Sequence, residues 1–295
     1  MKPTEPMPYF IKPPKTDAVL RLESLPAYIS LDYQHIEFMA ASMVRYALDR
    51  VSEKIGTRGV LVTLSGGSDS STVTAACKRA MSYGVKSDLL AVTVVTDPDN
   101  RMESEDLESA TSLCRQLNVE HKVFDARQIV DETDKIIGID NSRVYADSVA
   151  RARNALVRST ADKYGLLVAG TSNKSENMIR GFADGLAQPS FSFIRELYKT
   201  EVINFGRHLG VPESILSRDP GGSEMRRTEA ELYGASYVDC LDAVLYLLDS
   251  NMKPEDISSH GIDLEWLKDL ETRVKDHEWR TRSLVYDRQQ LYGGE

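Results

Sequence analysis

The stretch that most constrains the fold of this chain is residues 59–71, Gly-Val-Leu-Val-Thr-Leu-Ser-Gly-Gly-Ser-Asp-Ser-Ser. Its apolar half, Val60–Leu64, has the composition of a buried β-strand. Small residues then form a loop, Ser65–Ser70, and a helical pattern follows directly over Ser71–Met81. A strand that enters a glycine loop at a helix N-terminus is a phosphate-binding arrangement, because the loop amides and the helix dipole both point toward an anion.

The residues of this loop suit an anionic ligand. Gly66 and Gly67 let the backbone approach the ligand without an intervening Cβ atom. Ser65, Ser68 and Ser70 supply hydroxyl donors. The sequence therefore predicts that this segment binds a phosphate group.

Asp69 is the unexpected member of the loop, because a bare carboxylate repels a phosphate. It fits the site if it binds a Mg²⁺ ion that bridges to the phosphates. The run is not a Walker loop, since no Gly-Lys-Ser/Thr ends it. The alternative interpretation is an ordinary glycine turn in which Asp69 or Ser70 caps the next helix.

The loop resembles the pyrophosphate loop, Ser-Gly-Gly-x-Asp-Ser, of the N-type ATP pyrophosphatases. That group includes NAD synthetases, GMP synthetases, argininosuccinate synthetases and several tRNA-modifying enzymes. Its members adenylate a substrate oxygen with ATP and release pyrophosphate, which the loop holds. The resemblance thus implies that ATP is a substrate and that Mg²⁺ accompanies it.

The charge and the cysteines narrow the choice within this group. The 295 residues include 36 basic and 45 acidic side chains, for a net charge of −9. An acidic chain disfavours a nucleic-acid-binding surface, which counts against the tRNA-modifying enzymes. Cys77, Cys114 and Cys240 form no Cys-x-x-Cys pair, which disfavours a zinc site, a disulfide framework and thiolation chemistry.

Targeting signals are missing from the sequence. No apolar run reaches the length of a membrane span, and the N-terminus lacks the apolar stretch of a signal peptide. We therefore expect a cytoplasmic protein that binds neither membranes nor nucleic acids.

Strand and helix patterns alternate through the first part of the chain. This alternation predicts an α/β fold, a doubly wound parallel sheet with helices on both faces. Such sheets bind ligands at the carboxyl ends of their strands. The expected strands are Val60–Leu64, Leu89–Val95, Glu120–Phe124 and Leu166–Ala169, and the expected helices are residues 32–55, Ser71–Met81, Glu103–Leu117 and Val144–Lys163.

The two ends of the chain differ from this pattern. We expect an N-terminal arm over residues 1–30 and a single domain over residues 31–295 with a helical C-terminal part. Its helices are expected at Tyr198–Leu209, Ser236–Asp249 and Leu264–Arg282. The helix over residues 32–55 has an apolar stripe that either packs in the core or forms an interface between copies: Ile36, Met39, Met43, Tyr46, Ala47 and Val51.

A second polar loop follows the strand Leu166–Ala169 and narrows the resemblance to one family. Residues 170–176, Gly-Thr-Ser-Asn-Lys-Ser-Glu, look like the Gly-Thr-x-Asn-Lys-x-Glu loop of NAD synthetases. Other stretches match that family in the same order, namely Ala150–Arg153, Leu197–Thr200, His208–Pro212, and Ser236–Tyr237 with Leu241–Asp242. The resemblance runs from Tyr33 to Asp249 and implies an adenine nucleotide alpha-hydrolase-like fold.

The resemblance implies a role for each matching residue. Asp69 and Glu176 would bind Mg²⁺, and Asp69 and Lys199 would be the catalytic residues, with Lys199 on an ATP phosphate. Arg151 and Asp184 would bind the dinucleotide substrate. The residues implied to bind ATP are Ser65, Gly66, Gly67, Ser68, Asp69, Ser70, Ser71, Thr171 and Lys199.

Each of these roles has an ordinary alternative. Glu176 fits a helix-capping acid, Lys199 fits a solvated helix lysine, and Arg151 fits a surface ion pair. The presence of both carboxylates, the lysine and the glycine loop in one chain favours the functional interpretation.

The match to the family weakens in the loop that would bind the carboxylate substrate. After the glutamate the family has a Lys, then Tyr-Gly-Asp-Gly, and then a second Asp. Residues 181–191 here are Gly-Phe-Ala-Asp-Gly-Leu-Ala-Gln-Pro-Ser-Phe, so Asp184 matches while the Lys and the second Asp have no counterpart. The ATP half of the site matches better than the acceptor half, as expected if the carboxylate substrate has changed.

The sequence thus predicts an ATP-dependent amide ligase that adenylates a carboxylate, releases pyrophosphate and transfers the acyl group to ammonia. The first hypothesis is NAD synthetase, which converts deamido-NAD, ATP and ammonia to NAD, AMP and pyrophosphate. The second is a relative that acts on another carboxylate or amine, and the third is a non-catalytic nucleotide-binding module. We expect no glutaminase domain in a chain of this length, and the resemblance implies a homodimer.

Overall fold

A computed structural model gives the arrangement of most of the chain. It describes residues 14 and 19–281, apart from 56, 98, 141, 180–188, 219–220 and 223–226.

Four parallel strands form the main sheet, in the order β3-β2-β1-β4. They are β1 (Gly59–Thr63), β2 (Asp88–Val95), β3 (Glu120–Asp125) and β4 (Leu166–Ala169). The chain builds outward from β1 through β2 to β3 and then returns to place β4 on the other side of β1. The direction of winding therefore reverses between β1 and β4, and such a switch point is where open α/β sheets bind ligands.

Helices connect and cover these strands. The α-helices are α1 (Tyr33–Ile55), α2 (Ser68–Ser82), α3 (Arg101–Leu117), α4 (Arg127–Ile137), α5 (Ser142–Tyr164), α6 (Lys174–Ile179), α7 (Lys199–His208), α8 (Glu213–Leu216), α9 (Glu229–Tyr233), α10 (Asp242–Asp249), α11 (Pro254–Ile257) and α12 (Leu264–Thr281). Shorter elements are the 3₁₀ helices η1 (Leu22–Ser24) and η3 (Ser258–His260), a π-helical turn η2 (Tyr237–Leu241), and a small antiparallel pair, β5 (Gly221–Gly222) with β6 (Arg227–Thr228).

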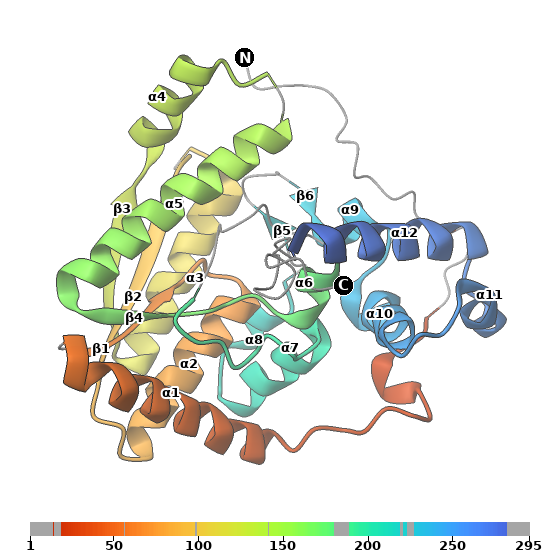
Figure 1. Ribbon diagram of the computed structural model, residues 1–295, viewed down its shortest axis with the longest axis horizontal. Helices are drawn as coiled ribbons and strands as arrows, with labels where there is room; N and C mark the ends of the chain where they lie inside the picture. Colours follow the sequence, from red (N-terminus) through yellow and green to blue (C-terminus); the bar gives the residue numbers. More distant parts are fainter. Residues whose placement is uncertain are drawn as a thin grey trace, which may run out of the picture.

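Both faces of the main sheet are buried. Side chains alternate along β1, so Val60 and Val62 pack in a core with residues of α1, α2, α3 and α7. Leu61 points the other way and packs with residues of α4 and α5. Figure 1 shows α5 across one face of the sheet and α1 and α2 on the other. This double burial explains why β1 is a continuous apolar run rather than an alternating one.

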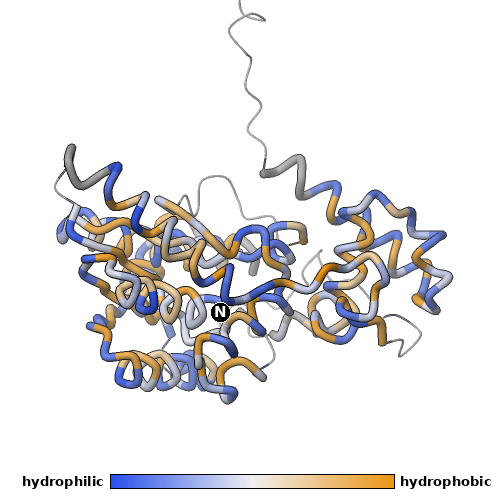
Figure 2. The backbone as a smooth tube through the Cα atoms, turned by 90° about the horizontal axis from the view of Figure 1, so that it is seen from below, coloured by the Kyte–Doolittle hydropathy of each residue, from blue (hydrophilic) through white to orange (hydrophobic). Residues whose placement is uncertain are grey.

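The C-terminal helices have a core of their own. Leu241, Leu245 and Leu267 are fully buried there, among residues of α9 to α12. Figures 1 and 2 both place α10, α11 and α12 beside the sheet-bearing part, and Figure 2 shows hydrophobic segments in both parts. Leu22 and Leu25, from the predicted arm, join this C-terminal core. The division into an arm over 1–30 and a domain over 31–295 stays a prediction.

The apolar stripe expected on the first long helix is divided between the core and the surface. Ile36 and Ala47 pack against the core. Met39 and Tyr46 of α1 expose 52% and 60% of their surface. The inward face carries Ala41, Val44 and Leu48, which pack against α2. The small alanine lets the two helices approach closely. The core interpretation is therefore wrong for Met39 and Tyr46.

Candidate active site

Two polar loops leave the sheet at its switch point. One follows β1 at Leu64, and the other follows β4 at Gly170. Because β1 and β4 are paired in parallel, these loops lie at the same edge of the sheet. The Asn173 side-chain amide donates a hydrogen bond to Asp69 Oδ1 at 3.0 Å, and thus joins the second loop to the first.

The loop after β1 folds on its own serine side chains. Ser70 Oγ accepts a hydrogen bond from the Ser65 amide at 3.1 Å and lies 3.0 Å from Ser65 Oγ. It also lies 3.3 Å from the Gly67 carbonyl, to which it donates. These contacts close the loop into a tight turn that leads straight into α2.

Helix α2 begins earlier than the sequence pattern indicated. Its first residue is Ser68 rather than Ser71, so Asp69 and Ser70 lie in the first turn of the helix. Gly67 is the N-cap residue, and as a glycine it has no side-chain oxygen to occupy the first-turn amides. These amides and the helix dipole are therefore available to an anion.

Gly66 fits a position that no other residue tolerates. Its φ angle is +86°, and a Cβ atom added to it would lie 2.1 Å from the Asp106 carbonyl oxygen of α3. Arg218, which follows α8, donates to the Gly66 carbonyl and pairs with Asp106 at 3.1 Å. The backbone of the loop is thus held between α3 and Arg218.

A buried charged cluster stands next to this loop. The Lys199 ammonium, from the first residue of α7, contacts Asp69 Oδ2 and lies 3.6 Å from Glu176 Oε1 of α6. Asn173 completes the group, since its side-chain oxygen accepts a hydrogen bond from the Glu176 amide at 2.9 Å. The structure therefore brings together three residues that the sequence analysis selected from three separate stretches.

The three charged side chains of this cluster are largely buried. The side chain of Lys199 is only 3% exposed, that of Glu176 is 9% exposed and that of Asp69 is 14% exposed. Among the described residues, both carboxylates contact the Lys199 ammonium, in surroundings where solvent screens charge weakly. The carboxylate oxygens are ligands that Mg²⁺ prefers, and Mg²⁺ commonly takes one or two carboxylates plus substrate phosphates.

A fully buried carboxylate lies behind the cluster. Asp242, the first residue of α10, accepts hydrogen bonds from Ser175 Oγ and from the Thr200 amide, both at 2.6 Å. Burial raises the pKa of Asp242 from its ordinary value of 3.8 to about 6, and the hydrogen bonds from Ser175 and Thr200 offset part of that rise.

We expect this carboxyl to make the stability of the protein pH-dependent. Because the pKa of Asp242 is raised in the folded state, its protonation stabilises the folded protein. This stabilisation is fully present below pH 4 and is lost as the pH rises through about 6. The free energy of unfolding of the wild type should fall, relative to that of Asp242→Asn, by on the order of 3 kcal/mol between pH 4 and pH 7. Urea unfolding of both proteins across this range measures the difference, and a constant difference would contradict the expectation.

The structure describes three of the four remaining predicted site residues. Thr171 is partly exposed in the loop after β4, two residues before Asn173. The Ser71 hydroxyl is fully buried, and among the described residues it has no hydrogen-bond partner. Arg151 is exposed on α5, and no described contact joins it to the charged cluster. Asp184 lies outside the described residues.

Arg153, two residues after Arg151, contacts Glu103, and the sequence analysis did not select it. Arg153 donates to Glu103 Oε1 at 2.6 Å, and the same oxygen accepts a hydrogen bond from the Thr96 amide at 2.9 Å. Arg153 and Glu103 therefore hold the turn after β2, at the same edge of the sheet as the two polar loops. The signal was present, because Arg153 belongs to the Ala-Arg-Ala-Arg stretch from which only Arg151 was selected.

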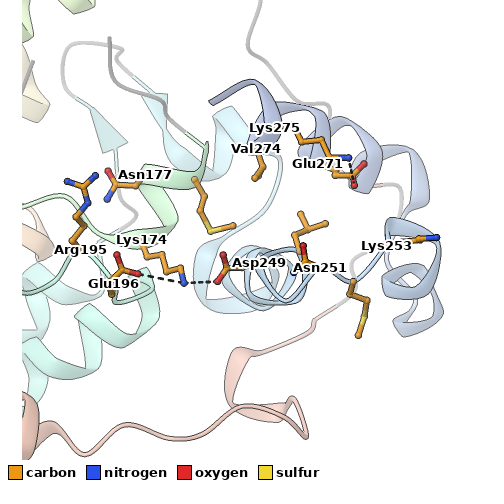
Figure 3. Close-up of a pocket in the computed structure, with 13 residues that line it drawn as sticks. Lys174, Asn177, Arg195, Glu196, Asp249, Asn251, Lys253, Glu271, Val274 and Lys275 are labelled. Atoms are coloured by element: carbon orange, nitrogen blue, oxygen red, sulfur yellow. Dashed lines mark hydrogen bonds and ion pairs between the residues drawn. The ribbon is translucent and has the colours of Figure 1, made fainter. Parts of the chain in front are cut away.

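A cavity of about 700 Å³ opens on the other side of α6. Lys174, Asn177 and Met178 line it, whereas Glu176 points toward Lys199, as the helical spacing requires. Figure 3 shows Lys174 between Asp249, at 2.6 Å, and Glu196, at 3.9 Å. This cavity is therefore separate from the charged cluster.

Two negative findings apply to the described part of the chain. It contains no group of three or more His, Cys, Asp or Glu side chains that could hold a metal ion. None of its helices combines the length and the apolar character that crossing a membrane requires.

These features define the class of protein, an α/β protein with a glycine loop and a buried carboxylate–lysine cluster at the switch point of its sheet. Comparison with known proteins gives the particular family. The sequence model of NAD synthase matches residues 40–283. The chain belongs to the NAD synthase family.

Individual relatives agree with this assignment. The NH₃-dependent NAD⁺ synthetase of Thermococcus sibiricus is 32% identical over 258 residues, which cover 86% of this chain and 96% of that protein. The protein of the same name from Methanococcus aeolicus is 34% identical over 229 residues, covering 75% of this chain and 87% of the relative.

Solved structures share the fold. The NH₃-dependent NAD synthetase of Campylobacter jejuni superposes with a TM-score of 0.69 at 24% identity, over 87% of this chain and all of that one (100%). NMN synthetase from Francisella tularensis superposes with a TM-score of 0.70 at 19% identity, over 88% and 100%. The comparisons confirm the predictions of the family, of the α/β fold and of an ATP-dependent carbon–nitrogen ligase of the NAD synthetase type.

Proposed function

We propose that this protein joins ammonia to the carboxylate of deamido-NAD at the expense of ATP, with the loop Ser65–Ser70, Asp69, Glu176 and Lys199 as its adenylation site. The observation that carries the proposal is the Lys199 ammonium held by two carboxylates beside the open N-terminus of α2. A glycine loop alone binds many anions, whereas this combination suits a polyphosphate that leaves as an anion.

The proposed reaction has two steps. A carboxylate oxygen of deamido-NAD attacks the α-phosphorus of ATP, the bond to the bridging oxygen breaks, and pyrophosphate leaves. The nitrogen of ammonia then attacks the acyl carbon, the bond to the AMP oxygen breaks, and a proton passes to water. Adenylation converts a poor leaving group into a good one, so the protein mainly has to position the reactants and neutralise charge.

Residues of this chain supply the positioning in our proposal. The amides of Gly67 and of the first turn of α2 would bind the pyrophosphate, with the hydroxyls of Ser65, Ser68 and Ser70 beside them. The Lys199 ammonium would stabilise the charge that develops on the leaving group. Thr171, Ser71, Arg151 and Asp184 keep their proposed roles in binding ATP and the dinucleotide.

Asp69 and Glu176 would hold Mg²⁺ in this proposal. The donor set fits, because both side chains offer carboxylate oxygens and both contact the same group, the Lys199 ammonium. When bound, Mg²⁺ supplies neutralisation of the phosphate charge. The same carboxylates contact the Lys199 ammonium in the structure.

The acceptor is the part of the proposal that most needs a test. The purified protein is incubated with Mg-ATP, ammonium and either deamido-NAD or nicotinate mononucleotide, and the products are identified by mass spectrometry. NAD with AMP is expected from the first mixture. The second mixture tests a shorter acceptor, because a relative in fold is named NMN synthetase and Asp184 is the one acidic match in the divergent loop. AMP formed from the second mixture alone would contradict the NAD synthetase proposal.

We expect Lys199→Gln to lower kcat for AMP formation by about 100-fold, with little change in KM for deamido-NAD. The ammonium is the one cation placed against both carboxylates among the described residues, and glutamine cannot replace its charge. The matched control is Lys268→Gln. This lysine of α12 is 54% exposed and forms an ion pair with Glu255 of α11. Equal activity of the two variants in a steady-state AMP assay would contradict the proposed role of Lys199.

We also propose that the protein forms a homodimer in the cytoplasm. The outward stripe of α1, with Met39, Met43 and Tyr46, exposes apolar surface of the kind that interfaces cover. The three cysteines are free thiols, which suits a reducing compartment. Light scattering after size-exclusion chromatography measures the mass, and a single chain mass for both the wild type and Met39→Glu would contradict the dimer.

A further inference from the structure

A buried carboxylate on a helix outside the sheet reaches the base of the catalytic lysine. Asp242 has none of its surface exposed, and it lies in the first turn of α10 between Leu241 and Ala243, which fill the C-terminal core. Burying a carboxylate is costly unless hydrogen bonds satisfy it. An apolar side chain would fill the space at lower cost, so the carboxylate has to be explained by what its oxygens hold.

Both carboxylate oxygens of Asp242 are linked by hydrogen bonds to the first turn of α7. Oδ2 accepts directly from the Thr200 amide at 2.6 Å. Oδ1 accepts from Ser175 Oγ at 2.6 Å, and that same hydroxyl oxygen accepts from the Lys199 amide at 2.9 Å. The first amides of a helix lack partners within the helix, and a carboxylate placed there is also favoured by the helix dipole. Asp242 thus satisfies two of these amides, one directly and one through a serine.

The position of Lys199 follows from these bonds. Its side chain leaves the backbone at the point that Ser175 and Asp242 fix, and it ends at Asp69 and Glu176. Ser175 precedes Glu176 in α6, so the same hydrogen bond also ties the helix of Glu176 to the helix of Lys199. The Asp242 carboxylate therefore links three helices, α6, α7 and α10.

We propose that Asp242 is a positioning residue for the adenylation step, acting through the backbone of Lys199. The inference rests on the proposed function of Lys199 at the ATP phosphates. Asp242 does not touch the substrates in this account, and it sets where the lysine ammonium lies when pyrophosphate leaves. A displacement of about 1 Å at a reacting group lowers a rate by about 100-fold.

The first test is Asp242→Asn, which keeps the shape of the side chain. One amide oxygen remains to accept from the Thr200 amide, but an NH₂ group replaces the oxygen that accepts from the Ser175 hydroxyl. We expect kcat for AMP formation to fall about 10- to 100-fold, while KM for deamido-NAD changes less than threefold. Asp256→Asn, which changes an exposed carboxylate of α11, is the control and should keep the wild-type kcat. Circular dichroism and thermal unfolding verify that each variant is folded at the assay temperature.

The second test separates positioning from general stability. In a Lys199→Gln background, Asp242→Asn should lower kcat less than threefold further, because the residue that it positions is already gone. Residual turnover is counted with radiolabelled ATP. Full additivity of the two losses would overturn the proposal, as would a kcat of Asp242→Asn equal to that of Asp256→Asn. A Lys199→Gln variant with wild-type kcat would instead overturn the proposed function of Lys199, and the two failures are therefore distinguishable.

Ser175 provides a second route if Asp242→Asn does not fold. Ser175→Ala removes the bonds to Asp242 and to the Lys199 amide, whereas Ser175→Thr keeps the hydroxyl. We expect the alanine variant to lose kcat in the same direction and the threonine variant to retain more of it. Equal kcat for both would overturn the route through Ser175.

Discussion

Replacing Asp69 with Asn is expected to lower the rate of AMP and pyrophosphate formation by about 1,000-fold. The substitution removes one of the two carboxylates proposed to hold Mg²⁺, and it also removes the direct partner of the Lys199 ammonium. An electrostatic group that acts on the leaving group is worth this much because the site is buried and preorganised. The rate is measured as AMP formed from saturating deamido-NAD and ammonium.

The control for Asp69 is Asp88→Asn, which removes an exposed carboxylate from the amino end of β2, at the opposite edge of the sheet. Its rate should equal that of the wild type. Raising the Mg²⁺ concentration should restore part of the activity of Asp69→Asn and should not affect Lys199→Gln, because only the first variant loses a proposed metal ligand. An Asp69→Asn rate within fivefold of the wild type would contradict the proposed site.

The sequence predicted the elements around the site better than their ends. The strand, the glycine loop and the helix after it are all present, because each depends on local composition. The start of α2 was misplaced, since Gly67 adopts an extended conformation (φ −82°, ψ 170°) that permits an N-cap three residues earlier than expected. Helix α4 was missed altogether, because its polar sequence over Arg127–Ile137 buries only Val130.

Contacts between residues that are far apart in the sequence could be identified only from the structure. Lys199 and Asp69 are 130 residues apart, and Ser175 and Asp242 are 67 apart. No local pattern fixes which lysine meets which aspartate, and family resemblance supplied these residues singly. Spacing alone groups the exposed Met39 with Ile36, which packs against the core, whereas the face of α1 that meets α2 carries the small Ala41.

The second large effect is expected for Gly66→Ala. The residue has a φ angle of +86°, and the new methyl group would lie 2.1 Å from the Asp106 carbonyl oxygen, so the loop and α3 must separate. The strain of the left-handed backbone and the overlap together cost about 3 kcal/mol. We expect the variant to unfold at lower urea concentration and to lose most ATP-dependent turnover, because the loop amides no longer converge on the phosphates.

Gly67→Ala is the matched control, because it adds the same methyl group to the neighbouring residue without either penalty. Gly67 has an ordinary φ of −82°, and its added Cβ atom would lie 3.5 Å from Ser65 Oγ, an ordinary contact. Its stability should therefore match the wild type. If Gly67→Ala nevertheless loses ATP turnover, the methyl group is blocking a ligand, which places the phosphates against the N-terminus of α2. If both variants are as stable as the wild type, the packing of Gly66 against α3 is not what fixes the loop.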